Sequence, residues 1–380
     1  MRSGQLKNIC YVTILLPFVI VIITNLAICR NQDGKSELSQ RVKPSPEHLR
    51  MGTDVGIRRV LSHEWKHTKE FLHRESYNFT INNPEVCHTT GRLHDGVFLL
   101  VIVVTTPQNF VQRLQFRQTW GSRTQFKDEQ IRTLFLTGRG PNSTMQYKLK
   151  AENDKYEDII QADFEDRYLN LTLKTILALR WTLQYCPKAL YLLKSDDDMI
   201  VSYEKLSEYL YSLPWKQVPR LHMGTLLVNK PPFRSKHHKW YTSYDEWPEK
   251  HFPPYISGAA YVLGHSTVKE LYSAAMETPL FKFEDVFMGI CARKANLTLS
   301  HNHDLPDFRM GDHYSYCLYD GYITIHHAAS NLRWRYWKQL RSSQRPNCTV
   351  TGWKVFDYCS NIESSDPTYS VHGCETIQNW

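Results

Sequence analysis

The stretch VFLLVIVV (residues 97–104) is a continuous run of apolar side chains rich in β-branched residues. Such a run is typical of a strand buried on both faces of a parallel sheet, because a strand with one face in water alternates apolar and polar residues. Strand-like and helix-like segments alternate after it, which predicts a doubly wound α/β sheet with helices on both faces. The expected strands are 131–136, 158–164 and 189–194, and the expected helices are 110–120 and 169–186.

The composition of the whole chain is that of a globular protein. Its 380 residues carry a formal net charge of +8 and include 13% aromatic residues. The chain has neither the low hydrophobicity nor the charge runs of a disordered protein. Lysines and arginines are scattered among acidic residues, with no basic block and no nucleic-acid-binding motif. The charge therefore indicates a mildly basic, solvated surface and argues against a nucleic-acid partner.

The amino-terminal segment predicts a membrane anchor. Residues 9–28, ICYVTILLPFVIVIITNLAI, carry no charge, and about 20 apolar residues are what a helix needs to cross a bilayer. A cleaved signal peptide, with LAIC as its cleavage site, is the alternative. We expect an uncleaved signal anchor behind a cytoplasmic tail (residues 1–8), followed by a polar stem (residues 29–95) on the lumenal side.

Two further patterns indicate the secretory pathway. N-x-[ST] sequons are the acceptors of N-linked glycans, and the chain has five, at Asn78, Asn142, Asn170, Asn296 and Asn347. Seven cysteines follow the expected anchor, so disulfides are expected, with one thiol left free or paired between chains. These cysteines are Cys87, Cys186, Cys291, Cys317, Cys348, Cys359 and Cys374.

Three adjacent aspartates follow the expected strand 189–194. On an extended segment Asp196 and Asp198 share one side while Asp197 points away. Ligands bind at the carboxyl ends of strands in such sheets, and two carboxylates there suit Mg²⁺ or Mn²⁺. The alternative is a solvated acidic turn, or a cap in which Asp196 begins a helix near Ser202.

Other polar residues stand where burial would make them costly. Glu284 and Asp285 lie between apolar residues, and the strand-like run 322–329 contains His326 and His327, one of which could supply a nitrogen ligand. The small-residue loop YISGAAY (255–261) allows a ligand to approach the backbone. Each of these has an ordinary structural alternative: a helix cap, a satisfied core histidine or a tight turn.

Taken together and in order, these motifs resemble the β-1,3-galactosyltransferase and β-1,3-N-acetylglucosaminyltransferase family, which is related to the fringe glycosyltransferases. The resemblance covers residues 96 to about 340. It is carried by RQTWGS (117–122), DIIQADFEDRYLNLTLKT (158–175), LLKSDDDM (192–199), PPYISGAAYVL (253–263), EDVFMGIC (284–291) and ITIHH (323–327).

The resemblance implies a single GT-A-type domain (residues 96–340) with a Rossmann-like, mostly parallel sheet, followed by a cysteine-containing extension (residues 341–380). It implies a type II Golgi membrane enzyme that uses a UDP-sugar donor, a glycan acceptor on a glycoprotein or glycolipid, and Mn²⁺. The resemblance is compatible with either a homo-oligomer or a hetero-oligomer.

The resemblance also implies roles for individual residues. The implied metal ligands are Asp198, His326 and Asp196, and the implied general base is Asp285, beside Glu284. The residues implied on the nucleotide side are Arg117, Trp120, Lys174, Asp196 and Asp197, and those of the sugar loop are Ser257, Gly258 and Tyr261. The implied disulfide joins Cys291 to Cys317. Two positions depart from the family pattern. Ile256 stands where the family commonly has cysteine, and Ala260 replaces a glycine.

The expected reaction is the transfer of galactose with inversion at the anomeric carbon. The same mechanism with an N-acetylglucosamine or N-acetylgalactosamine donor is the closest alternative. A glycosidase that uses Asp198 and Asp285 as a carboxylate pair would need neither metal nor UDP. A catalytically silent, lectin-like lumenal protein is the alternative outside the enzymes.

Overall fold

The computed structural model describes residues 72, 77–89, 95–305, 315–326, 330–348 and 369–372. The expected cytoplasmic tail, anchor and most of the stem lie outside the described residues. Within the described part of the chain, no helix is long and apolar enough to cross a membrane.

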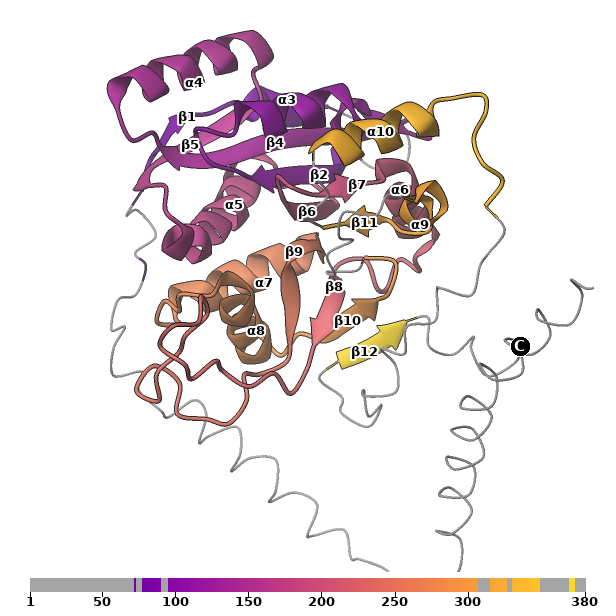
Figure 1. Cartoon of the computed structure of the whole chain (residues 1–380). Coiled ribbons are helices and arrows are strands. Elements are labelled where there is room, and N and C mark those ends of the chain that lie inside the picture. Colours follow the sequence, from indigo (N-terminus) through magenta and orange to yellow (C-terminus); the bar gives the residue numbers. More distant parts are fainter. Residues whose placement is uncertain are drawn as a thin grey trace, which may run out of the picture. The chain divides into compact units, whose positions relative to one another are not determined.

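The described residues build a ten-stranded sheet with the order β1-β5-β4-β2-β6-β9-β8-β10-β12, in which β3 pairs with β4; β7 and β11 form a separate pair (Figure 1). The strands are β1 (Phe79–Ile81), β2 (Val97–Val104), β3 (Gln125–Phe126), β4 (Glu129–Arg139), β5 (Ile159–Glu165), β6 (Tyr191–Asp196), β7 (Ile200–Val201), β8 (His222–Leu227), β9 (Tyr255–Gly264), β10 (Leu299–Asn302), β11 (Thr324–Ile325) and β12 (Tyr369–His372).

The helices of the described residues are α3 (Phe110–Gln118), α4 (Ser143–Tyr156), α5 (Leu171–Tyr185), α6 (Tyr203–Ser212), α7 (His265–Met276), α8 (Glu284–Lys294), α9 (Tyr316–Asp320) and α10 (Ser330–Leu340). From β2 to β6 the helices alternate with strands, as the sequence predicts, whereas α7 and α8 follow one another. Short 3₁₀ turns are η1 (Pro84–Cys87), η2 (Trp120–Ser122) and η3 (Tyr168–Asn170).

The centre of the sheet is parallel and its second half is mixed. Strands β5, β4, β2 and β6 run parallel to one another, but β9 is antiparallel to both β6 and β8. The expected buried parallel strand is therefore confirmed, and the sheet as a whole is mixed and mostly parallel, as expected. All eight residues of β2 are buried.

Both faces of β2 carry a hydrophobic core, as expected for a sheet covered on two sides. Leu100 and Ile102 join the core formed with α5, α7 and α8. Leu99, Val101 and Val103 join the core formed with α3, α6, α9 and α10 (Figure 1). Successive side chains of a strand point to opposite faces, so a strand without polar residues serves two cores at once.

Two disulfides lie in the described residues, and they correct one prediction. Cys87 pairs with Cys186, and Cys317 pairs with Cys348. Cys291 is a free, buried thiol, so the expected pair of Cys291 with Cys317 is wrong. Cys291 on α8 belongs to one core and Cys317 on α9 packs against the other, so the sheet separates them.

Candidate active site

The acidic triplet lies at the carboxyl end of β6. Asp196 and Asp198 lie close to His326, and one ligand atom from each residue falls within 4.8 Å of the others. His326 Nε2 is 3.7 Å from Asp198 Oδ1. His326 comes to the triplet because β11, which precedes it, pairs antiparallel with β7 directly after the triplet. Two carboxylates and an imidazole thus converge from segments about 130 residues apart in sequence.

Asp197 points away from this group, as the strand alternation predicts. Its Oδ2 accepts hydrogen bonds from Thr105 Oγ1 at 2.5 Å and from Asn109 Nδ2 at 2.7 Å. Burial raises the pKa of the Asp197 carboxyl, while these two hydrogen bonds oppose the rise. Val104 and Asp196 are in register on the parallel strands β2 and β6, so Thr105 follows β2 beside the triplet. The hydrogen bond between Asp197 and Thr105 therefore links the triplet to the end of β2.

Lys194 is a site residue that sequence reasoning missed. Its side chain is 1% exposed, and its ammonium lies 2.7 Å from Asp196 Oδ1 and 3.9 Å from Glu284 Oε2. It also donates a hydrogen bond to the carbonyl oxygen of Gly258. Burial disfavours the charged ammonium, but the carboxylates of Asp196 and Glu284 outweigh burial and raise the pKa of Lys194. The available signal was a lysine inside an otherwise apolar buried strand.

Glu284 and Asp285 begin α8, where the helix dipole favours carboxylates. Glu284 is buried, and its Oε1 accepts a hydrogen bond from the Tyr261 hydroxyl at 2.6 Å. Burial raises the pKa of Glu284, and Lys194 opposes that rise. Asp285 is less buried than Glu284. Both carboxylates line the adjoining pocket, and Asp285 is the more exposed of the two.

One pocket of about 600 Å³ is lined both by the acidic residues after β6 and by those at the start of α8. Its lining includes Asp196, Asp198, Glu284, Asp285 and His326. From β9, Ser257 and Gly258 line the same pocket, whereas Tyr261 is buried behind it. A Cβ atom added at Gly258 would lie 2.7 Å from Glu284 Oε2, so the glycine lets the carboxylate approach the strand.

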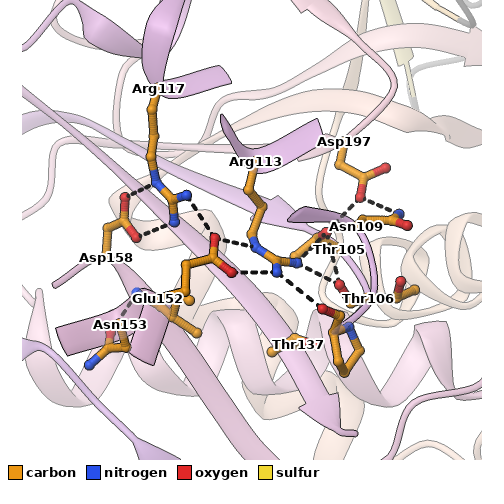
Figure 2. A network of polar contacts seen from close by, with 12 residues as sticks. Thr105, Thr106, Asn109, Arg113, Arg117, Thr137, Glu152, Asn153, Asp158 and Asp197 are labelled. Atoms are coloured by element: carbon orange, nitrogen blue, oxygen red, sulfur yellow. Dashed lines mark hydrogen bonds and ion pairs between the residues drawn. The ribbon is translucent and has the colours of Figure 1, made fainter. Parts of the chain in front are cut away.

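Arg117 and Arg113 form a buried ion-pair network instead of lining this pocket (Figure 2). Arg117 donates hydrogen bonds to Asp158 from Nε and Nη2, each at 2.8 Å, and to Glu152 from Nη1 at 2.7 Å. Arg113 is fully buried; it binds Glu152 and the backbone carbonyl of Thr106. Arg113 NH1 also reaches Thr105 Oγ1 at 3.4 Å, so the network supports the side chain that holds Asp197.

Trp120 and Lys174 are likewise buried and do not line the pocket within the described residues. The Trp120 ring packs edge-on against Phe116. Lys174 Nζ binds Asp166 at 2.9 Å and the carbonyl oxygen of Thr105 at 2.5 Å. Burial lowers the pKa of Lys174, against the opposing effect of Asp166. Lys174 thus binds the backbone of Thr105, the residue whose side-chain hydroxyl binds Asp197.

The five sequon asparagines all lie outside the buried core. Asn170 is partly buried, and Asn78, Asn142, Asn296 and Asn347 are exposed. Asn142 also caps α4, because its Oδ1 accepts a hydrogen bond from the backbone nitrogen of Met145 at 2.9 Å. Ser202, and not Asp196, caps α6. This excludes the alternative in which Asp196 is a helix cap.

Comparisons with known proteins agree with the motifs. The sequence profile of the family described as Galactosyltransferase matches residues 111–303. The chain is 31% identical to human "Beta-1,3-galactosyltransferase 5" over 281 residues, covering 74% of this chain and 88% of that protein. It is 32% identical to mouse "Beta-1,3-galactosyltransferase 1" over 279 residues, covering 73% of this chain and 82% of that protein.

Similarity to solved structures is weaker. The structure of a galactosyltransferase LgtC in complex with donor and acceptor sugar analogues aligns with a TM-score of 0.35 at 11% identity, over 61% of this chain and 87% of that chain. The glycosyltransferase GlyE of Streptococcus pneumoniae TIGR4 also gives 0.35 at 11% identity, over 64% and 59% of the two chains. The family assignment rests on the sequence matches: the chain belongs to the galactosyltransferase family.

Proposed function

We propose that this protein transfers galactose from UDP-galactose to a sugar hydroxyl on a glycoprotein or glycolipid glycan, forming a β-1,3 linkage with inversion on a GT-A-type domain. One observation carries the proposal. In a chain of the galactosyltransferase family, the group formed by Asp196, Asp198 and His326 and the carboxylate of Asp285 line one pocket.

The group formed by Asp196, Asp198 and His326 suits a divalent cation. Two carboxylates and one imidazole, with ligand atoms within 4.8 Å of one another, are a donor set suited to Mn²⁺. Asp198, His326 and Asp196 would hold the ion; when bound, it supplies Lewis-acid stabilisation of the diphosphate leaving group. Lys194 holds Asp196 by an ion pair, and the hydrogen bond of Asp197 with Thr105 holds the backbone between Asp196 and Asp198.

Asp285 is the proposed general base. The acceptor hydroxyl oxygen attacks the anomeric carbon as its proton passes to the Asp285 carboxylate. The bond from the anomeric carbon to the phosphate oxygen breaks, and its electron pair leaves with UDP. Attack from the face opposite UDP inverts the configuration in one displacement. A positioned carboxylate contributes roughly 10²–10⁴-fold to such a reaction.

Other residues receive supporting roles in this proposal. Ser257 and Gly258 belong to the sugar-side wall, and Tyr261, buried behind it, holds Glu284 through its hydroxyl. Arg117, Trp120 and Lys174 belong to the nucleotide side, and the contacts of Arg113 and Lys174 with Thr105 support an indirect action through Asp197. The disulfides and exposed sequons support a lumenal protein, and residues 9–28 support a type II Golgi membrane anchor.

The experiment is a donor panel. The full-length protein in detergent is incubated with Mn²⁺, β-linked acceptor glycosides, and UDP-galactose, UDP-N-acetylglucosamine or UDP-N-acetylgalactosamine. The product linkage is then read by NMR. We expect a β-1,3-galactoside whose formation stops with EDTA. Transfer only from an N-acetylhexosamine donor would replace the galactose assignment. EDTA-resistant hydrolysis of glycosides would indicate a glycosidase.

A further inference from the structure

The mouth of the pocket carries exposed aromatic side chains that the proposed chemistry does not use. Phe233, Trp240 and Tyr168 are 45%, 40% and 50% exposed, and all three line the same pocket as Asp285. Exposed apolar surface that gathers at a pocket mouth marks a ligand-binding surface, because water solvates it poorly.

The loop that carries Phe233 and Trp240 is internally organised. Arg234 donates hydrogen bonds to the backbone carbonyls of Thr242 and Ser243 through NH1, and to those of Trp247 and Glu249 through NH2. Four carbonyls bound to one guanidinium fix the path of residues 234–249. The Phe233 ring is stacked on the His238 ring, with centroids 3.7 Å apart. The aromatic surface is therefore preorganised, which lowers the entropic cost of binding.

The same loop is attached to both walls of the pocket. Trp240 Nε1 donates a hydrogen bond to the Tyr168 hydroxyl at 3.0 Å, which joins the loop to η3. Glu246 accepts a hydrogen bond from Lys282 Nζ at 2.6 Å, which joins the loop to the segment just before α8. Lys282 precedes the proposed base, Asp285, by three residues. The loop is thus fixed at η3 and also at the segment that leads to the proposed base.

We propose that Phe233, Trp240 and Tyr168 form the acceptor platform: they bind an acceptor pyranose through its apolar C–H face and leave its hydroxyl edge toward Asp285. This inference rests on the proposed transferase function, because only a transferase has an acceptor. A pyranose has one face rich in C–H bonds, and the negative face of an aromatic ring attracts such hydrogens while both surfaces leave water.

The uridine of the donor is the competing occupant, because aromatic rings also stack on bases. The attachment of the loop favours the acceptor. The diphosphate belongs with Asp196, Asp198 and His326, which come from β6 and the end of β11, whereas the loop is fixed through Lys282 to the start of α8.

The test is direct binding, without transfer. β-Methyl galactoside and β-methyl N-acetylglucosaminide are titrated into the full-length protein, and binding is followed by saturation-transfer NMR. We expect Trp240→Ala to weaken glycoside binding about tenfold, as for other aromatic anchors. Trp240→Phe should bind close to wild type, since it keeps the ring and loses only the hydrogen bond to Tyr168. Tyr168→Ala, which lies outside the loop, should also weaken binding and leaves the loop sequence intact.

Trp215→Ala is the matched control, because Trp215 is 65% exposed and lines a different pocket; its binding should equal wild type. UDP binding with Mn²⁺ should be the same in Trp240→Ala and wild type. The proposal is overturned if wild type binds neither glycoside, if Trp240→Ala and Tyr168→Ala bind them as wild type does, or if Trp240→Ala loses UDP instead. If Trp240 contributes to glycoside binding but the protein transfers no sugar, the proposed function is refuted. The assignment of a sugar-binding surface to Phe233, Trp240 and Tyr168 would then still hold.

Discussion

The ammonium of Lys194 lies 2.7 Å from the carboxylate of Asp196, in a position where the lysine side chain is 1% exposed. The same ammonium binds the carbonyl oxygen of Gly258 and faces Glu284 at 3.9 Å. One buried cation therefore connects the proposed metal group on β6, the sugar-side strand β9 and the start of α8. The site depends on this charge as well as on the carboxylates around it.

Replacing Lys194 with methionine should destabilise the protein strongly. The substitution keeps the shape but leaves the carboxylates of Asp196 and Glu284 without their cation, which typically costs about 3–5 kcal/mol for a buried pair. Urea denaturation measures the change. Lys205→Met is the control: Lys205 binds Asp320 but is 35% exposed, so its loss should cost less than about 1 kcal/mol. Equal stability of the two variants would contradict the argument.

Asp285→Asn should separate binding from chemistry. The amide keeps the size of the side chain but cannot accept the proton of the acceptor hydroxyl, so turnover should fall by roughly 10²–10⁴-fold. The affinity for UDP-galactose, measured by calorimetry, should stay near wild type. Asp154→Asn, on the exposed side of α4, is the matched control. Turnover of Asp285→Asn near the wild-type rate would remove Asp285 as the base.

Asp198→Ala should weaken Mn²⁺-dependent UDP binding, because it removes one of the two carboxylates of the group. We expect a loss of at least about tenfold in the apparent Mn²⁺ affinity, as for metal sites that lose a supporting group. Titration of Mn²⁺ at fixed UDP measures it, and Asp154→Ala is the control. An unchanged metal titration would refute the ligand assignment.

Stability should fall with decreasing pH partly because of His222. This histidine on β8 is fully buried, and burial lowers its pKa from 6.5 to about 3. Between those two values the unfolded chain binds a proton that the folded chain excludes. The free energy of unfolding should therefore decrease as pH falls from 6.5 toward 3, by at most about 1.4 kcal/mol per unit.

The variant His222→Phe tests this assignment. It keeps a ring beside Tyr261, whose ring centroid is 5.8 Å from that of His222, and removes the titrating group. Urea titrations from pH 7 to 4 should show a shallower decrease than wild type. The exposed His237→Phe should follow the wild-type curve, since His237 is solvated in both states. Parallel curves for His222→Phe and wild type would exclude His222 as a cause.

The cysteines should differ in reactivity. Burial raises the pKa of the Cys291 thiol to about 12, so alkylating reagents should label it only after unfolding. A non-reducing peptide map should contain the linked pairs Cys87–Cys186 and Cys317–Cys348. Cys291→Ala should leave both pairs intact. A linked peptide of Cys291 and Cys317 would contradict the structure.

The sequence predicted those parts of the fold that local patterns determine. The apolar run at β2 identified a doubly buried strand, and strand alternation placed Asp196 and Asp198 together and Asp197 apart. The antiparallel direction of β9 was not predictable from its residues, because a buried apolar strand has the same pattern in either direction.

The errors at the site have a similar cause. The pairing of Cys291 with Cys317 was inferred from a resemblance in sequence, which does not say on which side of a sheet a cysteine lies. Lys194 was overlooked because a lysine next to a charged loop resembles a solvated residue. The nucleotide-side role of Arg117 stays a prediction from a motif; its motif did not reveal that the guanidinium binds Asp158 and Glu152.

The disulfide between Cys87 and Cys186 has a mechanical consequence. It lies between the edge strand β1 and the central strand β2, and joins that connection to the end of α5. A pull from the amino-terminal side could peel β1 away from β5, but the covalent link at Cys87 would carry the load before it reached β2. A pull at the amino-terminal side is thereby diverted from β2 to the segment between α5 and β6.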